Sequence, residues 1–418
     1  MEEDEDRWLV GVDWASQSHR AYLLNRRGKP LGERDFAHSG TGLAELAAWV
    51  LERTGAEPHQ VWVAIETPHG PVVEALMERG FRVFSINPKQ LDRFRDRFSP
   101  AGAKDDSRDA HVLADALRTD PQALRELAAA DPAVVELREW SRLAEDLQQE
   151  RTRLANRVRD QLWRYYPQAL ELSDDLAADW FLELWAMAPT PQKAKRTRSS
   201  AVARLLARHR IRRIDAAGAL AILNKPALKL APGTSEAATA HIKAVAARLQ
   251  LVNRQIKEAQ VQLDRLIESL APEGDAEGQL GEQRDVTILR SLPGVGRIVL
   301  ATLLAEAGEP LQRRDYHALR GLCGTAPVTK RSGRSMIVLR RRASCQRLVN
   351  AVYHWARVAV QHDPRSRAKY AALRGRGHGH ARALRSVADP LLAVACAMLQ
   401  DQTEFDITRA GDVPVATA

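Results

Sequence analysis

Three aspartates fall within five positions of the chain, Asp105, Asp106 and Asp109, in the stretch AKDDSRDAHVLADAL. On a helix, residues three positions apart lie on one face, so Asp106 and Asp109 would hold their carboxylates side by side. Like charges at that distance repel each other unless a cation lies between them or water solvates both. The spacing leaves two interpretations, a metal-binding pair and the solvated first turn of a helix, where acidic residues favour the positive end of the dipole.

Two more acidic residues occur where hydrophobic strands are expected to end. Asp13 follows LVGV, and Glu66 follows VWVAI. A carboxylate directly after a buried strand lies at the rim of the sheet, where it can meet other rim residues. Four such carboxylates can hold two divalent ions, the usual arrangement for cleaving a phosphodiester bond. Together with Asp106 and Asp109, these residues predict a site for Mg²⁺, with Mn²⁺ as an alternative.

The charge of the chain favours a polyanionic partner. The formal net charge is +9 and the sequence pI is about 9.7. Residues 193–213 and 330–350 are rich in Lys and Arg and contain no acid. Such stretches bind nucleic acid or, less specifically, are ordinary basic surface. The candidate nucleic-acid contacts in them are Lys193, Lys195, Arg196, Arg198, Lys330, Arg331, Arg334, Arg340, Arg341 and Arg342.

The three cysteines are far apart in sequence, so neither a zinc knuckle nor a disulfide framework is expected. The acidic N-terminus lacks the features of a signal peptide, and we expect a cytoplasmic protein.

Hydrophobic patterns predict three regions of different architecture. Residues 8–125 contain short β-branched runs and then strands that alternate with helices, typical of a mixed sheet covered by helices. Residues 134–166 and 242–270 have apolar residues every three or four positions, which predicts long helices in a coiled coil or in a helical bundle. Residues 270–285 are predicted to be a linker.

The region after the predicted linker opens with LRSLPGVGRIVLATLLAEAG. Its turn resembles that of a helix-hairpin-helix module, in which the backbone at Gly294 and Gly296 would bind phosphate. An ordinary connection between two helices is the alternative. We therefore predict three domains, at 1–125, 126–285 and 286–418, the last of them mostly helical.

The order of these motifs resembles that of the insertion-sequence transposases of family one-ten. The resemblance rests on Asp13 at the first strand, Glu66 at the fourth, KDDSRDA on a helix, and SLPGVGRIVLATLLAEAGE and LCGTAPVTKRSGRS in the last domain. It covers nearly the whole chain in the same domain order. It implies an RNase H-like (RuvC-like) DEDD catalytic domain at 1–125, a helical coiled-coil domain at 126–285, and a C-terminal transposase domain at 286–418.

The resemblance also implies an activity. Proteins of this family are recombinases that combine the DEDD metal site with a C-terminal serine, which maps to Ser332, with Ser335 and Ser344 close enough to be alternatives. They bind a structured bridge RNA that pairs with donor and target DNA. The expected partners are therefore double-stranded DNA, this guide RNA and further copies of the chain, as a dimer or a tetramer in the synaptic complex, at the bacterial nucleoid.

Two other functions agree with the same residues. A structure-selective endonuclease of the Holliday-junction type would use the four acids and water, without a covalent serine intermediate. A non-catalytic scaffold that binds nucleic acid would use the acids only structurally. A protein–DNA adduct and the effect of replacing Asp13 distinguish these possibilities.

Overall fold

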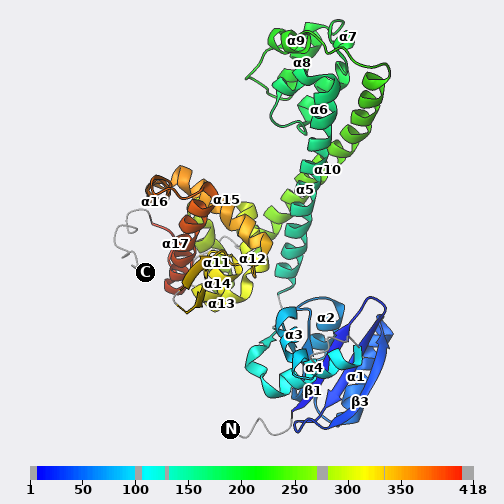
Figure 1. The fold of residues 1–418 in the computed structure, drawn as a ribbon, viewed down its shortest axis with the longest axis vertical. Coiled ribbons are helices and arrows are strands. Elements are labelled where there is room, and N and C mark those ends of the chain that lie inside the picture. The colour runs from blue at the N-terminus through cyan, green and yellow to red at the C-terminus, as the bar shows by residue number, and fades with distance from the viewer. Residues whose placement is uncertain (1–6, 99–105, 128–130, 271–280, 334, 407–418) are drawn as a thin grey trace. The chain divides into compact units, whose positions relative to one another are not determined.

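The computed structural model describes residues 7–98, 106–127, 131–270, 281–333 and 335–406 (Figure 1). The chain folds into two compact units, Met1–Ala130 and Asp131–Ala418. The boundary between the units lies five residues after the predicted end of the first domain (130 − 125 = 5). The predicted boundary near 285 falls inside the second unit and stays a prediction.

The first unit contains a mixed sheet with the strand order β3-β2-β1-β4-β5-β6. The strands are β1 (Trp8–Trp14), β2 (Ser18–Leu24), β3 (Pro30–Ala37), β4 (Val61–Ile65), β5 (Arg82–Ser85) and β6 (Arg125–Glu126). The first three are antiparallel neighbours, β1, β4 and β5 run parallel, and β6 pairs antiparallel with β5. The predicted mixed sheet with helices is confirmed.

Helices cover both faces of this sheet. Side chains along β1 point to alternate faces, so Val10 and Val12 belong to one apolar core and Leu9 to another. The helices of the unit are α1 (Gly40–Thr54), α2 (Pro71–Glu78), α3 (Pro88–Asp96) and α4 (Asp106–Thr119). The core of Val10 and Val12 contains α1 and α2 residues, whereas the core of Leu9 contains α3 and α4 residues.

Helix α1 was not among the sequence predictions, although its ends carry recognisable signals. The Ser39 side chain accepts a hydrogen bond from the Gly42 N–H at the start of the helix. Gly55 ends the helix in the left-handed region, with φ of 63°. A capping serine, an apolar stripe and a terminal glycine are the usual signature of a helix of this length.

Two long helices form the stem of the second unit, α5 (Pro132–Tyr165) and α10 (Thr234–Leu270). They lie side by side, as Figure 1 shows. Most of the regularly spaced apolar residues of 242–270 are buried on α10, whereas Ile256 and Leu270 are half-buried. The predicted long helices are thus present, and α10 begins eight residues earlier than predicted (242 − 234 = 8). Coiled-coil winding stays a prediction.

The distal end of the stem carries a small helical subdomain with its own core (Figure 1). Its helices are α6 (Asp179–Met187), α7 (Pro191–Ala194), α8 (Ser199–Arg208) and α9 (Ala216–Leu223). Large aromatic side chains fill this core, among them Tyr165, Tyr166 and Phe181. Burial raises the pKa of the Tyr166 hydroxyl, which donates a hydrogen bond of 3.1 Å to the Leu223 carbonyl.

A polar network around the buried Asn253 interrupts the apolar stem. Asn253 on α10 accepts a hydrogen bond of 2.9 Å from Arg151 on α5, and its amide donates one of 2.6 Å to Asp179. Lys257 donates a hydrogen bond of 3.0 Å to the other oxygen of Asp179. Burial opposes the ionisation of Asp179, but these hydrogen bonds from Asn253 and Lys257 outweigh it and lower its pKa. The network favours one alignment of the two helices, because sliding would leave the buried Asn253 amide unpaired.

Replacing Asp179 with asparagine should therefore weaken folding most at neutral pH. A carboxyl group whose pKa is depressed in the folded state adds stability above its unfolded pKa of about 4, and this stability is lost as the pH falls through the lower folded value. We expect a loss of about 1 kcal/mol in the free energy of unfolding at pH 7. Urea unfolding followed by tryptophan fluorescence measures it. A difference between wild type and variant that stays constant down to about pH 3 would contradict this assignment.

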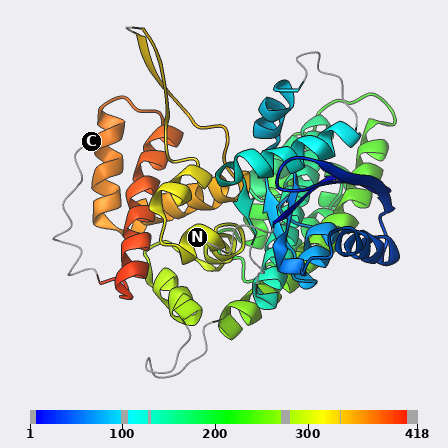
Figure 2. The same cartoon turned by 90° about the horizontal axis from the view of Figure 1, so that it is seen from below.

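The remaining helices pack around the other end of the stem (Figure 2). They are α11 (Gly281–Ser291), α12 (Arg297–Glu306), α13 (Gly308–Gln312), α14 (Tyr316–Leu322), α15 (Gln346–His362), α16 (Pro364–Gly375) and α17 (His380–Asp401). A hairpin of β7 (Val328–Ser332) and β8 (Ser335–Leu339) interrupts them. The predicted mostly helical C-terminal region is confirmed.

Among the described helices, α17 is long and apolar enough to span a membrane by length and composition. Its apolar side chains, however, belong to the C-terminal core, and more than half of its apolar window is buried there. A core helix of a water-soluble domain has the same properties.

Candidate active site

The parallel pairing of β1 with β4 brings two of the predicted acidic residues to neighbouring positions. Val12 lies opposite Ile65 at the end of this register, so Asp13 and Glu66 follow one step further along adjacent strands. Residues at matching positions of parallel strands point to the same face and are about 5 Å apart along the backbone hydrogen-bonding direction. Side chains an even number of positions apart on a strand point to the same face. Asp13 therefore points to the face of Leu9, and Glu66 to the face of Ala64, which is the face that α4 covers.

The start of α4 lies at this same end of the sheet. The Ala110 carbonyl packs so closely against Gly11 that a Cβ atom there would come within 1.9 Å of the oxygen. The end of α4 lies near the turn between β2 and β3, because the Arg118 side chain approaches Gly28. That turn is at the beginning of β1, so α4 runs antiparallel to β1. Its first turn, which contains Asp106 and Asp109, is therefore directed toward Asp13.

Arg95 on α3 binds the carboxylate of Asp109. Its guanidinium donates two hydrogen bonds to the two oxygens of Asp109, 2.6 and 3.0 Å long, and a third of 2.5 Å to Asp92. The side chains of Arg95 and Asp109 are only 14% and 13% exposed. The pair is thus largely desolvated, and removing one partner would leave a buried charge. No pattern in the sequence had pointed to Arg95.

The four predicted acids offer only carboxylate oxygens, the ligands that hard divalent cations prefer. Among the residues whose side chains are described, no group of three or more His, Cys, Asp or Glu is close enough to hold a metal ion. The side chain of Asp106 lies outside this set, and Asp109 is bound to Arg95. The donor chemistry therefore fits a divalent ion, but such an ion would have to displace Arg95 from Asp109 or share the carboxylate with it.

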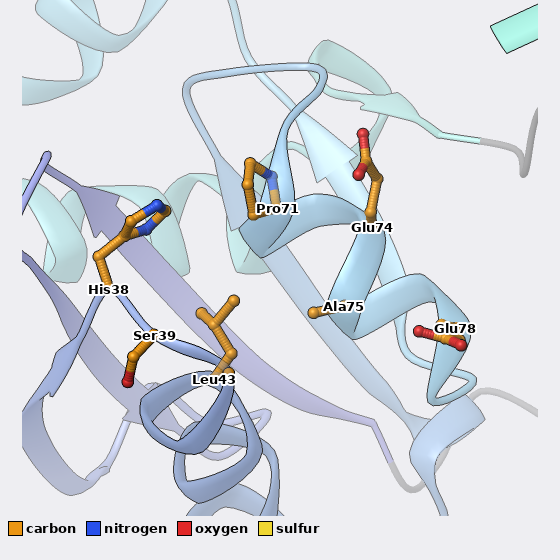
Figure 3. A pocket seen from close by; sticks show the side chains of 8 residues that line it. His38, Ser39, Leu43, Pro71, Glu74, Ala75 and Glu78 are labelled. Carbon is orange, nitrogen blue, oxygen red and sulfur yellow. The ribbon is translucent and has the colours of Figure 1, made fainter. Parts of the chain in front are cut away.

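A shallow pocket lies on the opposite side of the sheet, between the start of α1 and α2 (Figure 3). His38, Pro71, Glu74 and Glu78 are among its lining residues. Buried His19 hydrogen-bonds to His38 at 2.9 Å, and burial, with His38 next to it, lowers the pKa of His19. None of the predicted catalytic residues lines this pocket, so it is separate from the acidic site.

Ser332 lies at the last residue pair of the β7–β8 ladder, directly opposite Ser335. Both serines are exposed, and Figure 2 shows the hairpin projecting from the C-terminal helices. Ser344 differs, since it is half-buried and a Cβ atom on Gly324 would come within 3.2 Å of its hydroxyl oxygen. Lys330 and Arg331 are exposed next to Ser332 on β7, whereas Arg334 lies outside the described residues.

The other predicted nucleic-acid contacts fall into two groups. Lys193, Lys195, Arg196 and Arg198 are exposed on and next to α7 and α8, and none of them forms an ion pair with a described residue. Arg340 and Arg342 are also exposed, and Arg341 is half-buried with a side-chain Nε that has no hydrogen-bond partner in the described structure.

Packing against α15 explains why a glycine is needed at position 294. Gly294 has φ of 85°, and a Cβ atom on it would come within 2.8 Å of the Ala359 nitrogen on α15. The indole of Trp355 donates a hydrogen bond of 2.9 Å to the Pro293 carbonyl. Gly296 is exposed and precedes α12 without a side-chain cap. Close packing thus explains Gly294, and phosphate binding at Gly294 and Gly296 stays a prediction.

Comparison with known proteins identifies the class. Residues 10–167 match a family model described as a transposase, of the DEDD type, which in general indicates use of a divalent metal ion. Residues 286–371 match a model described as a transposase of the IS116/IS110/IS902 family. These two matches define a transposase, an enzyme that acts on DNA.

Similar proteins extend this result over the whole chain. The mini-circle putative transposase for IS117 of Streptomyces coelicolor is 32% identical over 98% of both chains. The 42 kDa protein of insertion element IS900 of Mycobacterium paratuberculosis is 29% identical over 95% of this chain and 96% of its own. The putative transposase y4uE of Sinorhizobium fredii is 62% identical, over 51% of this chain and 60% of that relative. The chain belongs to the IS110 family of insertion-sequence transposases, as its motifs predicted.

Proposed function

We propose that this transposase cuts and rejoins DNA through a serine–DNA intermediate at Ser332, with a Mg²⁺ site of Asp13, Glu66, Asp106 and Asp109. A bridge RNA that pairs with donor and target DNA would direct it in the bacterial cytoplasm. The observation that carries the proposal is the register that sets Asp13 next to Glu66, with the first turn of α4 directed toward them. The strand order, three antiparallel strands followed by two parallel ones, supports an RNase H-like fold.

The acidic residues would hold Mg²⁺, or Mn²⁺, through oxygen ligands. The bound ion would polarise the scissile phosphate and favour ionisation of the attacking hydroxyl. Asp13 and Glu66 would be placed by their strands, and Asp106 and Asp109 by the first turn of α4. Arg95 would keep the Asp109 carboxylate oriented and neutralised until the ion and the DNA are in place.

The proposed serine step exchanges one phosphodiester for another. The Ser332 Oγ would bond to phosphorus while the bond from phosphorus to one deoxyribose oxygen breaks; the hydroxyl proton leaves and the released oxygen takes up a proton. The energy of the broken bond would be conserved in the serine–DNA link, so the strands could be rejoined without an external energy source. The exposed position of Ser332 at the hairpin end supports access to DNA.

Two basic surfaces would bind the nucleic-acid backbone. The first is the exposed surface of Lys193, Lys195, Arg196 and Arg198, and the second is the hairpin and the Arg340–Arg342 segment that follows it. Phosphate contacts of this kind give affinity without sequence preference. Sequence choice would then come from base pairing between the bridge RNA and DNA, as in other guided systems.

Exposed apolar residues on the stem support assembly with a second copy of the chain. Trp163 on α5 is 70% exposed and Val261 on α10 is 64% exposed, and Leu143 and Leu251 are also exposed. Large apolar side chains on a helix exterior are often covered in an oligomer. A dimer, and a tetramer in the complex with both DNA partners, would cover them.

A recombination assay tests the proposed function. Purified protein, bridge RNA, donor DNA and target DNA are incubated with Mg²⁺, and the DNA is analysed for donor–target joints. We expect joints that require the protein, the RNA and the divalent ion together. Cut ends without joints, formed in the absence of RNA, would instead support a junction endonuclease. Binding with neither cuts nor joints would support a non-catalytic scaffold.

A further inference from the structure

A third basic stretch follows the hairpin, in residues 364–388. It contains no Asp or Glu and has a density of Lys and Arg comparable with that of the stretches predicted to bind nucleic acid. The sequence predictions did not include it, although the same criterion would have found it. Its basic residues are Arg365, Arg367, Lys369, Arg374, Arg376, Arg382 and Arg385.

The acidic residues that flank this stretch are already bound. Asp363 caps α16, where it accepts hydrogen bonds of 2.9 Å from the Ser366 N–H and 2.5 Å from the Ser366 hydroxyl. Asp389 accepts two hydrogen bonds from Arg320, 3.0 and 2.7 Å long, and one of 2.8 Å from Thr325. Both carboxylates are therefore held by neighbouring groups, and among the basic side chains between them the charge of Asp389 acts to raise the pKa of Lys369, against the larger effect of burial.

Three of the seven basic residues donate to backbone carbonyls, and one of them is Arg376, whose hydrogen bond of 3.4 Å goes to the Ala372 carbonyl. Arg367 donates to the Val360 and Gln361 carbonyls at the end of α15, and Arg374 donates a hydrogen bond of 2.7 Å to the His378 carbonyl. None of the seven forms an ion pair within the described part of the chain.

Arg382 and Arg385 lie in the first two turns of α17, and Arg340 is near enough for its charge to act on Arg385. Arg385 is half-buried, and its pKa is lowered by burial and by the charges of Arg340 and Arg382. Arg340 comes from the segment after β8, so residues distant in sequence contribute positive charge to one place. Like charges held together in this way lower stability unless an anion binds between them.

The backbone at this place also favours an anion. The residues between α16 and α17 are glycine-rich, and Gly377 has φ of 83°. Gly379 precedes α17 without a side-chain cap, so the first N–H groups of this 22-residue helix lack a capping side chain. His380 is held at 3.2 Å by the Tyr353 hydroxyl and at 2.7 Å by the Tyr370 hydroxyl, which fixes the start of α17 against α15 and α16.

We propose that residues 376–385 and Arg340 form a site for the phosphodiester backbone of a nucleic acid. We call it the α17 phosphate site. The family model matched in this region ends at residue 371, so it includes Arg340 but not residues 376–385. The inference rests on the proposed function in one respect, namely that the substrate is a nucleic acid. The backbone could belong to DNA or to the RNA, because both carry the same phosphates.

Salt-dependent binding distinguishes the two sources. Affinities for a donor DNA duplex and for a bridge-RNA hairpin are measured by fluorescence anisotropy between about 50 and 200 mM salt. The variant Arg382→Gln/Arg385→Gln should lower the slope of log K against log salt by about 2 for the nucleic acid that occupies the site, and Arg382→Gln alone by about 1. The affinity at the lower salt should fall roughly tenfold or more. If the slope and the affinity fall for DNA only, DNA occupies the α17 phosphate site, and if they fall for RNA only, RNA occupies it.

The matched control is Arg153→Gln/Arg157→Gln, which removes two exposed charges on α5, on a segment that also contains Glu150 and Asp160. It should leave both slopes unchanged. If the Arg382→Gln and double variants keep the wild-type slopes with both nucleic acids while wild type binds them, the α17 phosphate site is wrong and the proposed function is unaffected. If wild type binds neither nucleic acid, the proposed function itself fails. Thermal melting of Arg382→Gln, an exposed position, verifies that the variant is folded.

Discussion

Replacing Asp13 with asparagine should lower the rate of DNA strand cleavage by roughly three orders of magnitude, about 4 kcal/mol of transition-state stabilisation. Asparagine keeps the shape of the side chain on β1 but removes the charge that would hold a divalent ion beside Glu66. Binding of DNA and RNA should change little, because the basic surfaces that are proposed to bind them remain. Gel analysis of a labelled donor duplex measures cleavage, and anisotropy measures binding on the same samples.

Two variants make this test specific. Glu45→Gln is the matched control, because Glu45 is also a carboxylate of the first unit, but it is 54% exposed on α1, which covers the other face of the sheet, and it pairs with Arg34. It should cleave at the wild-type rate. Glu66→Gln should lose cleavage as Asp13→Asn does and should bind Mg²⁺ more weakly in a calorimetric titration. Full activity of Asp13→Asn, or equal loss in Glu45→Gln, would remove the acidic site from the mechanism.

Much of the first unit could be predicted because its signals are local. Alternating β-branched residues predicted the strands, and the acids after LVGV and VWVAI marked the strand ends. Gly11 inside a buried strand also carried information, since a strand glycine often marks the close approach of another backbone, here that of α4. Strand order and register could not be derived from these local patterns, because pairing between distant segments depends on the packing of the whole sheet.

Other features depended on contacts that no spacing reveals. Arg95 meets Asp109 only because α3 packs against α4, and no spacing rule links residues on separate helices. The β7–β8 hairpin was missed because its polar residues were interpreted as a basic loop. VTKRSGRSMIVL does contain a signal for it, because β-branched residues occur on either side of a glycine that directly follows β7. The α17 phosphate site combines a hairpin-proximal arginine with helix residues more than 40 positions later (382 − 340 = 42).

Replacing Ser332 with alanine should abolish the covalent link between protein and DNA. A serine hydroxyl can bond to phosphorus once a base or a metal ion helps to ionise it. The methyl side chain of alanine cannot form this bond. The exposed end of β7 and the basic side chains of Lys330 and Arg331 favour approach of a phosphate to this hydroxyl. Because the side chain is exposed, its loss should not affect folding, which a thermal melt verifies.

Ser335 provides a strict control for this assignment. It is paired with Ser332 in the hairpin, has the same hydroxyl and is also exposed. A difference in adduct formation between the two alanine variants should therefore reflect only which serine is the nucleophile. Protein, bridge RNA and labelled target DNA are analysed on a denaturing gel. An adduct should form with wild type and with Ser335→Ala and be absent with Ser332→Ala. An adduct that persists in Ser332→Ala and disappears in Ser335→Ala would show that Ser335, and not Ser332, is the nucleophile. Cut ends without any adduct in wild type would mean that water attacks the phosphate. Because hydrolysis does not conserve the energy of the phosphodiester bond, the rejoining step would then need another source of energy.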